Sequence, residues 1–551
     1  MAGSRNRGRA GRSMLLLAPA VLVLAVFFLL PLAGSIYRSF TDPVTGVQNY
    51  TGLLNDGVTT AVVLRTLGVA SLVTLVTLLL AYPYAYAMTK VGPTGRAVML
   101  TLALLPFWTS LLARNFAWLL LLQDHGPVQR LFEFFGRDGV VLFGTLTGVT
   151  VAMAQVLLPY MILPLYSSMQ SIDQRLLTAA RGLGAPPGKA FWKIFLPLSM
   201  PGVVAGVLLV FVLSLGFYVT PALLGSPQQS LVAQLLASRT RELVDFGGAG
   251  ALGTVVLLIA MVLLLVISRF GHGGGADTAA AGAGGAQHST ITWRGRISVF
   301  VVGFLLMAPT LVVIPMSFTA DSTFHFPPEE WSLRWYASFF ETVKWQRALQ
   351  NSLVIALLVS VVATVLGTAA ALAVNRAPQR IATIAASLLR SPLAVPNIVL
   401  AVAIYMLFLR WGLTGTMLGF TMAHTVLAIP FVLIAVSASL ASFDRQLTRA
   451  GASLGATPFA TFRKVMLPLI LPGVASGAVF AFVTSFDEVV VAIFLKSPRL
   501  TTLPALMYDS VTLEIDPTIG AASSIVVVGT SLLVIIPQLL QIRRVRKKAA
   551  S

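Results

Sequence analysis

The segment at 171–202 reads SIDQRLLTAARGLGAPPGKAFWKIFLPLSMPG, and the segment at 442–473 reads SFDRQLTRAGASLGATPFATFRKVMLPLILPG. The second segment repeats the pattern of the first 271 positions later, without a gap. Asp173 is matched by Asp444, and Gly184 is matched by Gly455. Each segment is polar and is flanked by long apolar runs. We therefore predict two homologous halves that each expose one equivalent surface loop.

The composition around these segments is that of a membrane protein. Hydrophobic residues make up 57% of the 551 residues, charged residues make up 10%, and the mean hydropathy is +0.87. Apolar runs of about 20 residues, enough to cross ~30 Å of hydrocarbon as a helix, recur along the chain. We expect an all-α polytopic membrane protein with twelve transmembrane helices, six in each half. The predicted spans are 14–34, 62–88, 97–122, 141–168, 201–224 and 248–268 in the first half, and 297–318, 352–374, 381–409, 414–440, 472–496 and 518–541 in the second.

A segment of different composition joins the halves. Residues 271–293 are rich in glycine and alanine and have no periodicity, which is typical of a flexible linker. We predict a first half over 1–270, with its loop at 171–200, and a second half over 294–551, with its loop at 442–471. The linker histidines are expected to be solvated, and no metal site is predicted.

Positive charges predict the orientation in the membrane. The N-terminal tail contains four arginines and the C-terminal tail contains five basic residues, which resist translocation. Both termini and both repeated loops are therefore expected on the cytoplasmic side. The first apolar run is expected to be a retained signal anchor rather than a cleaved signal peptide. We attribute the net charge of +19 to topology signals beside anionic membrane lipid, and we expect no nucleic-acid partner.

Each repeated loop is predicted to be a short helix, a turn and a second short helix at the cytoplasmic surface. The first helices are expected at 174–183 and 445–454, and the glycine that follows each can adopt a positive φ. Such amphipathic pieces often lie on lipid. Two copies at matching positions favour docking onto a partner that is itself two-fold.

These loops resemble the EAA loop of bacterial ABC-importer permeases. The matching positions are Ala179, Ala180 and Gly184 in the first half and Ala450, Gly451 and Gly455 in the second. The resemblance implies an inner-membrane importer with two fused permeases, whose loops dock on two ABC ATPase subunits. It also implies that the ATPases, not this chain, bind ATP and Mg, and that a periplasmic solute-binding protein delivers the small-molecule substrate. Thr178 and Arg449 stand where the motif has glutamate.

Further motifs are similar to those of spermidine/putrescine importers. They are PFWTS at 106–110, RNFAW at 114–118, GFYVTP at 216–221, SFDE at 485–488 and TTLP at 501–504. The implied substrate is a polyamine or a related small organic cation. Importers of iron(III), thiamine, opines or anions share the architecture and remain alternatives.

Two carboxylates lie inside a predicted span. Asp487 is fifteen residues beyond Pro472, which places it ~22 Å from the cytoplasmic end of a helix, and Glu488 follows it. A carboxylate that faces lipid costs about 2.5 kcal/mol or more. We expect Asp487, and with it Glu488, to face the substrate path and attract a cation. An ion pair with Arg114, or a helix break that faces water, is the alternative.

Aromatic residues in the outer halves of the spans are candidates for binding an ammonium group by cation–π contact, at about 0.5–2 kcal/mol each. They include Trp108, Phe217 and Tyr218. Tryptophan and tyrosine at interface depth are more typical of membrane anchors. His424, in mid-span, is expected to pack or hydrogen-bond rather than carry protons.

The chain itself is not expected to be an enzyme. Its nearest approach to a phosphate loop, GLGAPPGKA at 182–190, has no serine or threonine after the lysine. Two other classes of function remain open. One is an ion-coupled secondary transporter, because twelve spans in two parallel halves also suit that design. The other is a membrane sensor or scaffold whose loops hold a partner.

Overall fold

The computed structural model describes residues 15–270, 293–323, 326–514 and 516–532. Regular structure in these residues is helical, and one isolated β-bridge joins Thr319 and Trp331. Helices suit a bilayer because they satisfy every backbone hydrogen bond within the segment. The predicted all-α class is confirmed. Both basic tails, and the linker apart from Trp293, lie outside the described residues.

Nine helices in the described ranges are long and apolar enough to cross a membrane. They overlap nine of the predicted spans and are Leu15–Thr41, Gly57–Met88, Leu146–Gln170, Pro187–Leu215, Phe246–Val266, Gly295–Met316, Val343–Arg376, Met417–Ala441 and Pro458–Phe486. A shorter apolar helix, Thr518–Leu532, belongs to the last predicted span, which continues outside the described residues. If each of two bent helix pairs is counted as one span, the described residues contain eleven of the twelve predicted spans, and the shorter helix corresponds to the twelfth.

The two bent pairs correct the spans predicted at 97–122 and 381–409, which are not straight helices. Pro93–Phe107 meets Leu111–Phe134 at 94°, and Gln379–Ala394 meets Asn397–Trp411 at 96°. The first break follows from extended backbone at Thr109. The second precedes Pro396, whose ring disfavours a helical conformation at the residue before it.

Two other predicted spans end too late. The span at 201–224 contains the end of α11 (Leu196–Leu215), a break at Gly216 and the short helix α12 (Val219–Leu224). The span at 472–496 contains α23 (Leu467–Phe486), a break at Asp487 and α24 (Val490–Leu495). The two breaks are 271 positions apart, so they repeat with the loops.

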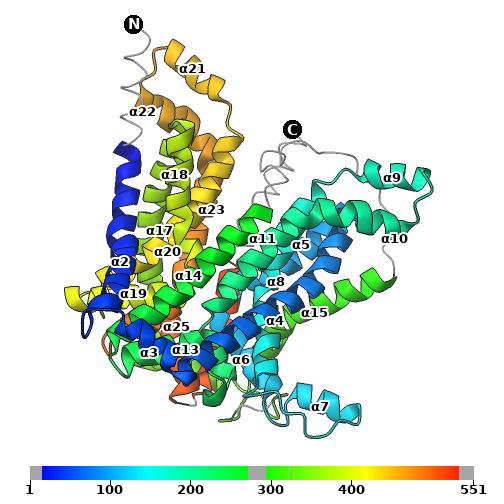
Figure 1. Ribbon diagram of the computed structural model, residues 1–551, viewed down its shortest axis with the longest axis vertical. Helices are drawn as coiled ribbons and strands as arrows, with labels where there is room; N and C mark the ends of the chain where they lie inside the picture. The colour runs from blue at the N-terminus through cyan, green and yellow to red at the C-terminus, as the bar shows by residue number, and fades with distance from the viewer. Residues whose placement is uncertain (1–14, 271–292, 324–325, 515, 533–551) are drawn as a thin grey trace. The chain divides into compact units, whose positions relative to one another are not determined.

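The first of two compact units comprises Met1–Tyr50, Arg239–Thr254 and Thr342–Tyr508. Its centre is formed by α17 (Val343–Arg376), α20 (Met417–Ala441) and α23, which all pack on one another. In the same unit, α2 (Leu30–Thr41) packs on α19 (Asn397–Trp411), as Figure 1 shows for the blue and yellow helices. Just before α2, the Phe27 ring meets Phe408 edge-on at 5.9 Å.

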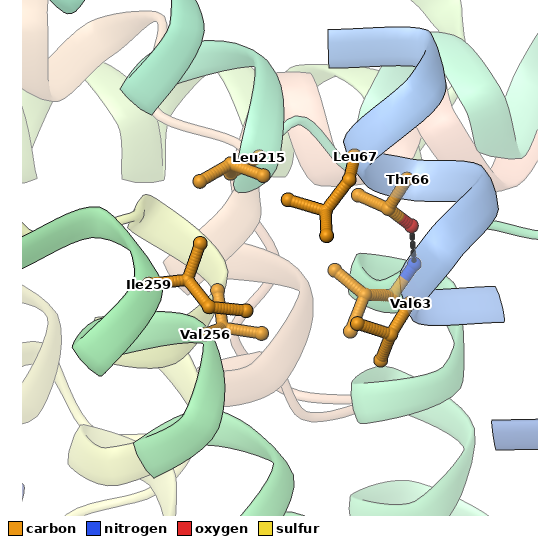
Figure 2. A pocket seen from close by; sticks show the side chains of 7 residues that line it. Val63, Thr66, Leu67, Leu215, Val256 and Ile259 are labelled. Carbon is orange, nitrogen blue, oxygen red and sulfur yellow. Dashed lines mark hydrogen bonds between the residues drawn. The ribbon is translucent and has the colours of Figure 1, made fainter. Parts of the chain in front are cut away.

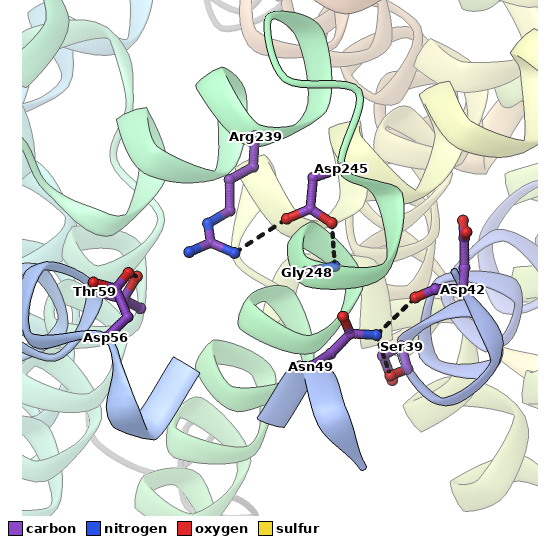
Figure 3. A network of polar contacts seen from close by, with 8 residues as sticks. All are labelled: Ser39, Asp42, Asn49, Asp56, Thr59, Arg239, Asp245 and Gly248. Atoms are coloured by element: carbon purple, nitrogen blue, oxygen red, sulfur yellow. Dashed lines mark hydrogen bonds and ion pairs between the residues drawn. The ribbon is translucent and has the colours of Figure 1, made fainter. Parts of the chain in front are cut away.

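Polar contacts hold the turns between helices in this unit (Figure 3). The Asn49 side-chain amide donates to the carbonyls of Asp42 at 2.8 Å and Ser39 at 2.9 Å. The Asp245 carboxylate pairs with the Arg239 guanidinium at 3.1 Å and accepts from the Gly248 N–H at 2.8 Å. These contacts stabilise the turn after α2 and the turn before α14 (Phe246–Phe270).

The second unit comprises Thr51–Ser238, Val255–Glu341 and Asp509–Ser551. Its centre is formed by α4 (Gly57–Met88), α8 (Leu146–Gln170) and α11, and α15 (Trp293–Met316) packs along α4. Gly206 lets α11 approach α8 closely, since a Cβ there would lie 2.6 Å from the Met161 sulfur. Each unit thus combines helices from both sequence halves. The boundaries expected for the two halves stay a prediction.

A small gap between helices in the second unit cannot hold a ligand. It has a volume of about 10 Å³ and is lined by Thr66, Leu215, Ile259 and other apolar side chains (Figure 2). That volume is at most one water molecule. The Thr66 hydroxyl is already used, because it accepts from the Val232 N–H at 2.9 Å. The gap is a packing defect between helices.

Candidate coupling loops and membrane path

The first repeated loop begins where an aspartate caps a short helix. The Asp173 carboxylate accepts from the Arg175 N–H at 2.9 Å and so starts α9 (Gln174–Gly182). After the turn come α10 (Pro187–Ala190) and a π-turn, η2 (Phe191–Phe195), which leads into α11. Figure 1 shows α9 and α10 at the end of the long helices.

The second loop repeats this order position for position. The Asp444 carboxylate accepts from the Gln446 N–H at 2.8 Å and starts α21 (Arg445–Ser453). It is followed by α22 (Pro458–Thr461) and the π-turn η5 (Phe462–Met466), which leads into α23. The predicted helix, turn and helix are therefore confirmed in both halves, with a π-turn added.

A left-handed glycine makes the turn in both loops. Gly184 has φ +84° and Gly455 has φ +79°, a conformation that costs a residue with a side chain about 1–2 kcal/mol. The N–H of Gly184 donates to the Arg181 carbonyl at 2.9 Å, and the N–H of Gly455 donates to the Ala452 carbonyl at 3.1 Å. The sharp turn projects the residue before each glycine outward.

The surface that both loops present is apolar at its tip. Leu183 is 89% exposed and Leu454 is 88% exposed, although both are leucines beside well-packed helices. Ala179 and Ala450 are exposed on the same short helices. Ala180 is buried and Gly451 is partly buried, so these two residues support the loops rather than line their surfaces.

Both loops carry exposed basic side chains. The exposed ones are Arg175, Arg181, Lys189 and Lys193 in the first loop and Arg449, Arg463 and Lys464 in the second. Asp173 and Asp444 serve as helix caps. The arrangement fits a partner with an apolar groove and acidic edges.

Aromatic rings support the first loop from α4. The Tyr86 ring lies edge-on to Phe195 at 4.9 Å and to Phe191 at 5.6 Å. The Tyr82 ring meets Phe191 at 6.2 Å, and its hydroxyl is 2.9 Å from the Ser199 hydroxyl. The π-turn of the first loop is therefore packed on α4 by several rings.

Lys90, just after α4, interacts electrostatically with the first loop. Its ammonium lies 5.3 Å from the centre of the Tyr86 ring. Burial lowers the pKa of Lys90, and the positive charge of Arg181 on α9 lowers it further. Any movement of α9 that changes the distance to Lys90 changes this repulsion.

The second loop has a different support. The stretch ALAVNR at 371–376, at the end of α17, matches AYAMTK at 85–90, at the end of α4, so Leu372 stands in place of Tyr86. Leu372 is buried. Phe462 of η5 has no ring partner in the part of the chain that the structure describes. The aromatic support belongs to the first loop alone.

In the membrane region of the first unit, Glu488 lies in a buried polar cluster. Its carboxylate accepts from the N–H groups of Val491 at 3.1 Å and Ala492 at 3.0 Å, at the start of α24. The second oxygen lies 3.6 Å from His424 Nε2. His424 Nδ1 is 3.0 Å from the Ser485 hydroxyl, which confirms the prediction of a hydrogen-bonding histidine.

Asp487 differs from its neighbour because it lies at the end of α23 and is partly exposed. A helix break at this position was one of the two alternatives predicted for it. Asp487 belongs to the first unit and Arg114 to the second, so their pairing stays a prediction. Of the two carboxylates, Asp487 is the one with a surface to offer a solute.

The predicted site residues of the first half lie around α6 (Leu111–Leu122) and α12 in the second unit. Arg114 is buried on α6, Tyr218 is buried just before α12, and Phe217 is partly buried beside it. Trp108 ends α5 (Pro93–Trp108), and its side chain lies outside the described part of the structure. Because α6 packs on α12, the helix that carries Arg114 lies beside the helix that follows Phe217 and Tyr218.

Two buried polar pairs were not predicted from the sequence. The Thr220 hydroxyl donates to the Asn115 side-chain oxygen at 2.6 Å, and the Trp118 indole N–H donates to the Gln155 oxygen at 3.1 Å. Both link α6 to a neighbouring helix. Polar residues within apolar runs were the available signal, because buried polar groups need partners.

A metal site does not emerge from the described ranges, which contain no group of three or more His, Cys, Asp or Glu side chains suited to a metal ion.

Comparisons with known proteins add relatives for most of the chain. A family model described as "Binding-protein-dependent transport system inner membrane component" matches residues 78–272 and 363–547. The spermidine/putrescine transport system permease protein PotB of Haemophilus influenzae is 36% identical over 252 residues, which cover 45% of this chain and 86% of that protein. The putrescine transport system permease protein PotI of Escherichia coli is 30% identical over 239 residues, which cover 42% of this chain and 85% of that protein.

Among solved structures, similarity is found to a bacterial ABC transporter involved in the import of the acidic polysaccharide alginate. The TM-score is 0.42 at 18% identity, and the match covers 48% of this chain and 98% of that chain.

Proposed function

This chain belongs to the binding-protein-dependent transport system inner membrane components, and from that premise we propose that it carries polyamines such as spermidine or putrescine. It is a multi-pass inner-membrane permease of an ABC importer, a transport subunit rather than an enzyme, with two permease regions in one chain. Iron(III), thiamine and opines remain the alternative substrates. The substrate reaches it from a solute-binding protein outside the cytoplasm.

The mechanism rests on the two repeated loops. Each presents an exposed leucine beside a left-handed glycine, with basic side chains around it. We assign Ala179, Leu183 and Gly184, and their counterparts Ala450, Leu454 and Gly455, to docking on two ATPase subunits. ATP and Mg are bound by those partners. Both loops and both termini face the cytoplasm, and ATP-driven closure of the partners moves the loops and alternates access to the path.

The residues that depart from the expected loop motif indicate which groups the partner should present. Thr178 and Arg449 replace glutamate, and the exposed charges around both tips are basic. Opposite charges across an interface favour docking and set its register. The ATPase groove is therefore expected to have carboxylates or carbonyl oxygens facing these loops. A loop that contained the glutamate would instead be expected to face a cation.

The observation that carries the proposal is the exposure of Leu183 and Leu454 at equivalent tips. Leu183→Asp and Leu454→Asp place a charge in a docking pocket but leave the packed helices untouched, because both side chains are almost fully exposed. In proteoliposomes with the ATPase and the binding protein, each variant should lose at least about tenfold in ATP-driven spermidine uptake, the effect of ~1.4 kcal/mol or more of lost docking.

Leu54→Asp, at another exposed leucine on α3 (Gln48–Asn55), is the matched control and should transport normally. Uptake that persists without ATP or the ATPase would contradict the ABC mechanism and favour an ion-coupled transporter. Loop variants that transport as well as Leu54→Asp would contradict the docking role. Docking without any uptake would favour a sensor or scaffold.

Asp487 is the residue proposed to attract the cationic substrate. It is partly exposed at a helix break, whereas Glu488 is buried under the amides of α24. Asp487→Asn keeps the shape and removes the charge, so spermidine uptake should fall about three- to tenfold, in line with one partly screened ion pair. Glu488→Gln tests stability rather than substrate preference. Unchanged uptake by Asp487→Asn would end the assignment.

A further inference from the structure

A groove of about 470 Å³ runs along the second unit between α4 and the beginning of α8. These two helices pack side by side over much of their length. The groove contains one charged residue, Arg65, and its other lining is apolar apart from the hydroxyls of Thr147 and Thr150. A charged end followed by an apolar channel is the shape of a site for an amphiphile.

The groove has the length of one lipid leaflet. Arg65, Gly68, Leu72 and Val76 recur at three- and four-residue steps, so they share one face of α4. At 1.5 Å per residue, the eleven steps from Arg65 to Val76 span about 16 Å. Half of a ~30 Å hydrocarbon layer is about 15 Å.

A glycine keeps the channel open. Gly68 is exposed, and a Cβ added there would meet no atom within 4 Å. Leu72, one turn further along, is 48% exposed although it lies in a membrane-spanning helix. In the membrane, lipid acyl chains can cover such an apolar surface.

Arg65 lies where a lipid phosphate would be. It is eight residues from the start of α4, or about 12 Å, and this helix of 32 residues is about 48 Å long, well beyond the hydrocarbon thickness. Arg65 donates to the Ser230 carbonyl at 3.1 Å, which steadies its side chain. A guanidinium has five N–H donors. Across the described ranges, Arg65 has no carboxylate partner.

The geometry points to a binding site for one anionic phospholipid of the outer leaflet. Its phosphate lies on Arg65, which suits bidentate hydrogen bonds to phosphate. The exposed Thr147 hydroxyl faces the glycerol region, and one acyl chain lies along Gly68, Leu72 and Val76. The inference rests on the membrane-spanning helices, and its assignment to the outer leaflet rests on the proposed orientation with both loops in the cytoplasm. It does not depend on the proposed substrate.

The experiment is native mass spectrometry of the full chain in detergent, titrated with palmitoyl-oleoyl phosphatidylglycerol or with the matching phosphatidylcholine. Wild type should retain one phosphatidylglycerol in preference to phosphatidylcholine. Gly68→Leu should weaken this binding at least about fivefold, because its side chain fills the channel. Gly34→Leu is the control, since Gly34 is also helical, a Cβ added there would meet no atom within 4 Å, and it lies outside the groove.

Arg65→Gln should weaken phosphatidylglycerol binding about tenfold, the effect of one charge-assisted hydrogen bond. Arg65→Lys should restore part of it. Excess inorganic phosphate should not displace the lipid, because phosphate has no acyl chain. Equal binding by Gly68→Leu and Gly34→Leu, equal affinity for the two lipids, or displacement by phosphate would each overturn the site.

Discussion

The loop around Gly184 and the loop around Gly455 share one backbone but rest on different supports. Both have an aspartate cap, a left-handed glycine and a π-turn, at positions 271 apart. Beneath the first loop Tyr86 packs against two phenylalanine rings, and the residue that matches Tyr86 in the second half is Leu372. The repeated part is what each loop presents outward, and the part that varies is what faces inward.

The same contrast continues inside the membrane. Ser214 and Ser485 are counterparts near the ends of α11 and α23. Ser214 donates to the Val210 carbonyl of its own helix, whereas Ser485 bonds the buried ring of His424. A shared outer geometry therefore permits each half its own interior, and the two halves should respond equally to changes at the turn and unequally to changes below it.

The largest expected effect tests what is shared. Gly184→Val and Gly455→Val each force a β-branched residue to positive φ, at a cost of about 1–2 kcal/mol or more. The turn should open in either variant, and uptake should fall about tenfold in both. Measurements in proteoliposomes decide this. A much larger loss in one loop than in the other would break the equivalence of the two turns.

The next effect tests the difference in the membrane. Ser485→Ala leaves a buried histidine nitrogen without its partner, which costs about 1–3 kcal/mol. Ser214→Ala removes only a bond within one helix and should cost less than about 0.5 kcal/mol. Thermal unfolding of the two variants in detergent measures the contrast. Equal destabilisation would show that the His424 contact adds nothing.

A smaller effect tests the supports of the loops. Tyr86→Leu gives the first loop the residue of the second and removes two ring pairs, worth about 0.5–1.5 kcal/mol each. Amide hydrogen exchange in η2 should become faster, and exchange in η5 should stay unchanged. Leu372→Tyr is the reciprocal variant and should not accelerate exchange in either loop. No change in η2 would mean that the rings do not hold it.

The smallest effect is a pH dependence confined to the first loop. Burial and Arg181 keep the pKa of Lys90 below its ordinary value, so between the folded and unfolded pKa values the unfolded chain binds more protons. Stability of the first loop should therefore rise as pH rises through that window. Arg181→Gln should raise the pKa of Lys90, and Arg181→Lys should not. Methyl-labelled lysine NMR measures this titration, and a pKa of Lys90 that ignores the loss of the Arg181 charge would refute the coupling.

Much of the loop geometry was predictable from sequence, because caps and left-handed glycines depend on neighbouring residues. The roles of Asp173 and Gly184 can be inferred from the residues next to them in the sequence. The second copy of the loop shows that the pattern is not accidental. The break before Leu111 was not predicted, and the break at Asp487 was predicted only as an alternative, because hydropathy averages side chains and carries no direction of the backbone. Pro396 was a usable signal for the other bend. The contact of His424 with Glu488 joins residues far apart in sequence, so no local pattern contains it.

The exchange of first helices between the sequence halves has a consequence for biosynthesis. α2 ends at Thr41 and its packing partner α19 begins at Asn397, so 355 residues are synthesised between them. At about 5–20 residues per second, the ribosome needs roughly 18–70 s to cover that interval. Throughout it, the earliest helix waits in the lipid without its permanent neighbour. Until α19 is made, the surface of α2 that packs on it in the finished fold is open to other neighbours.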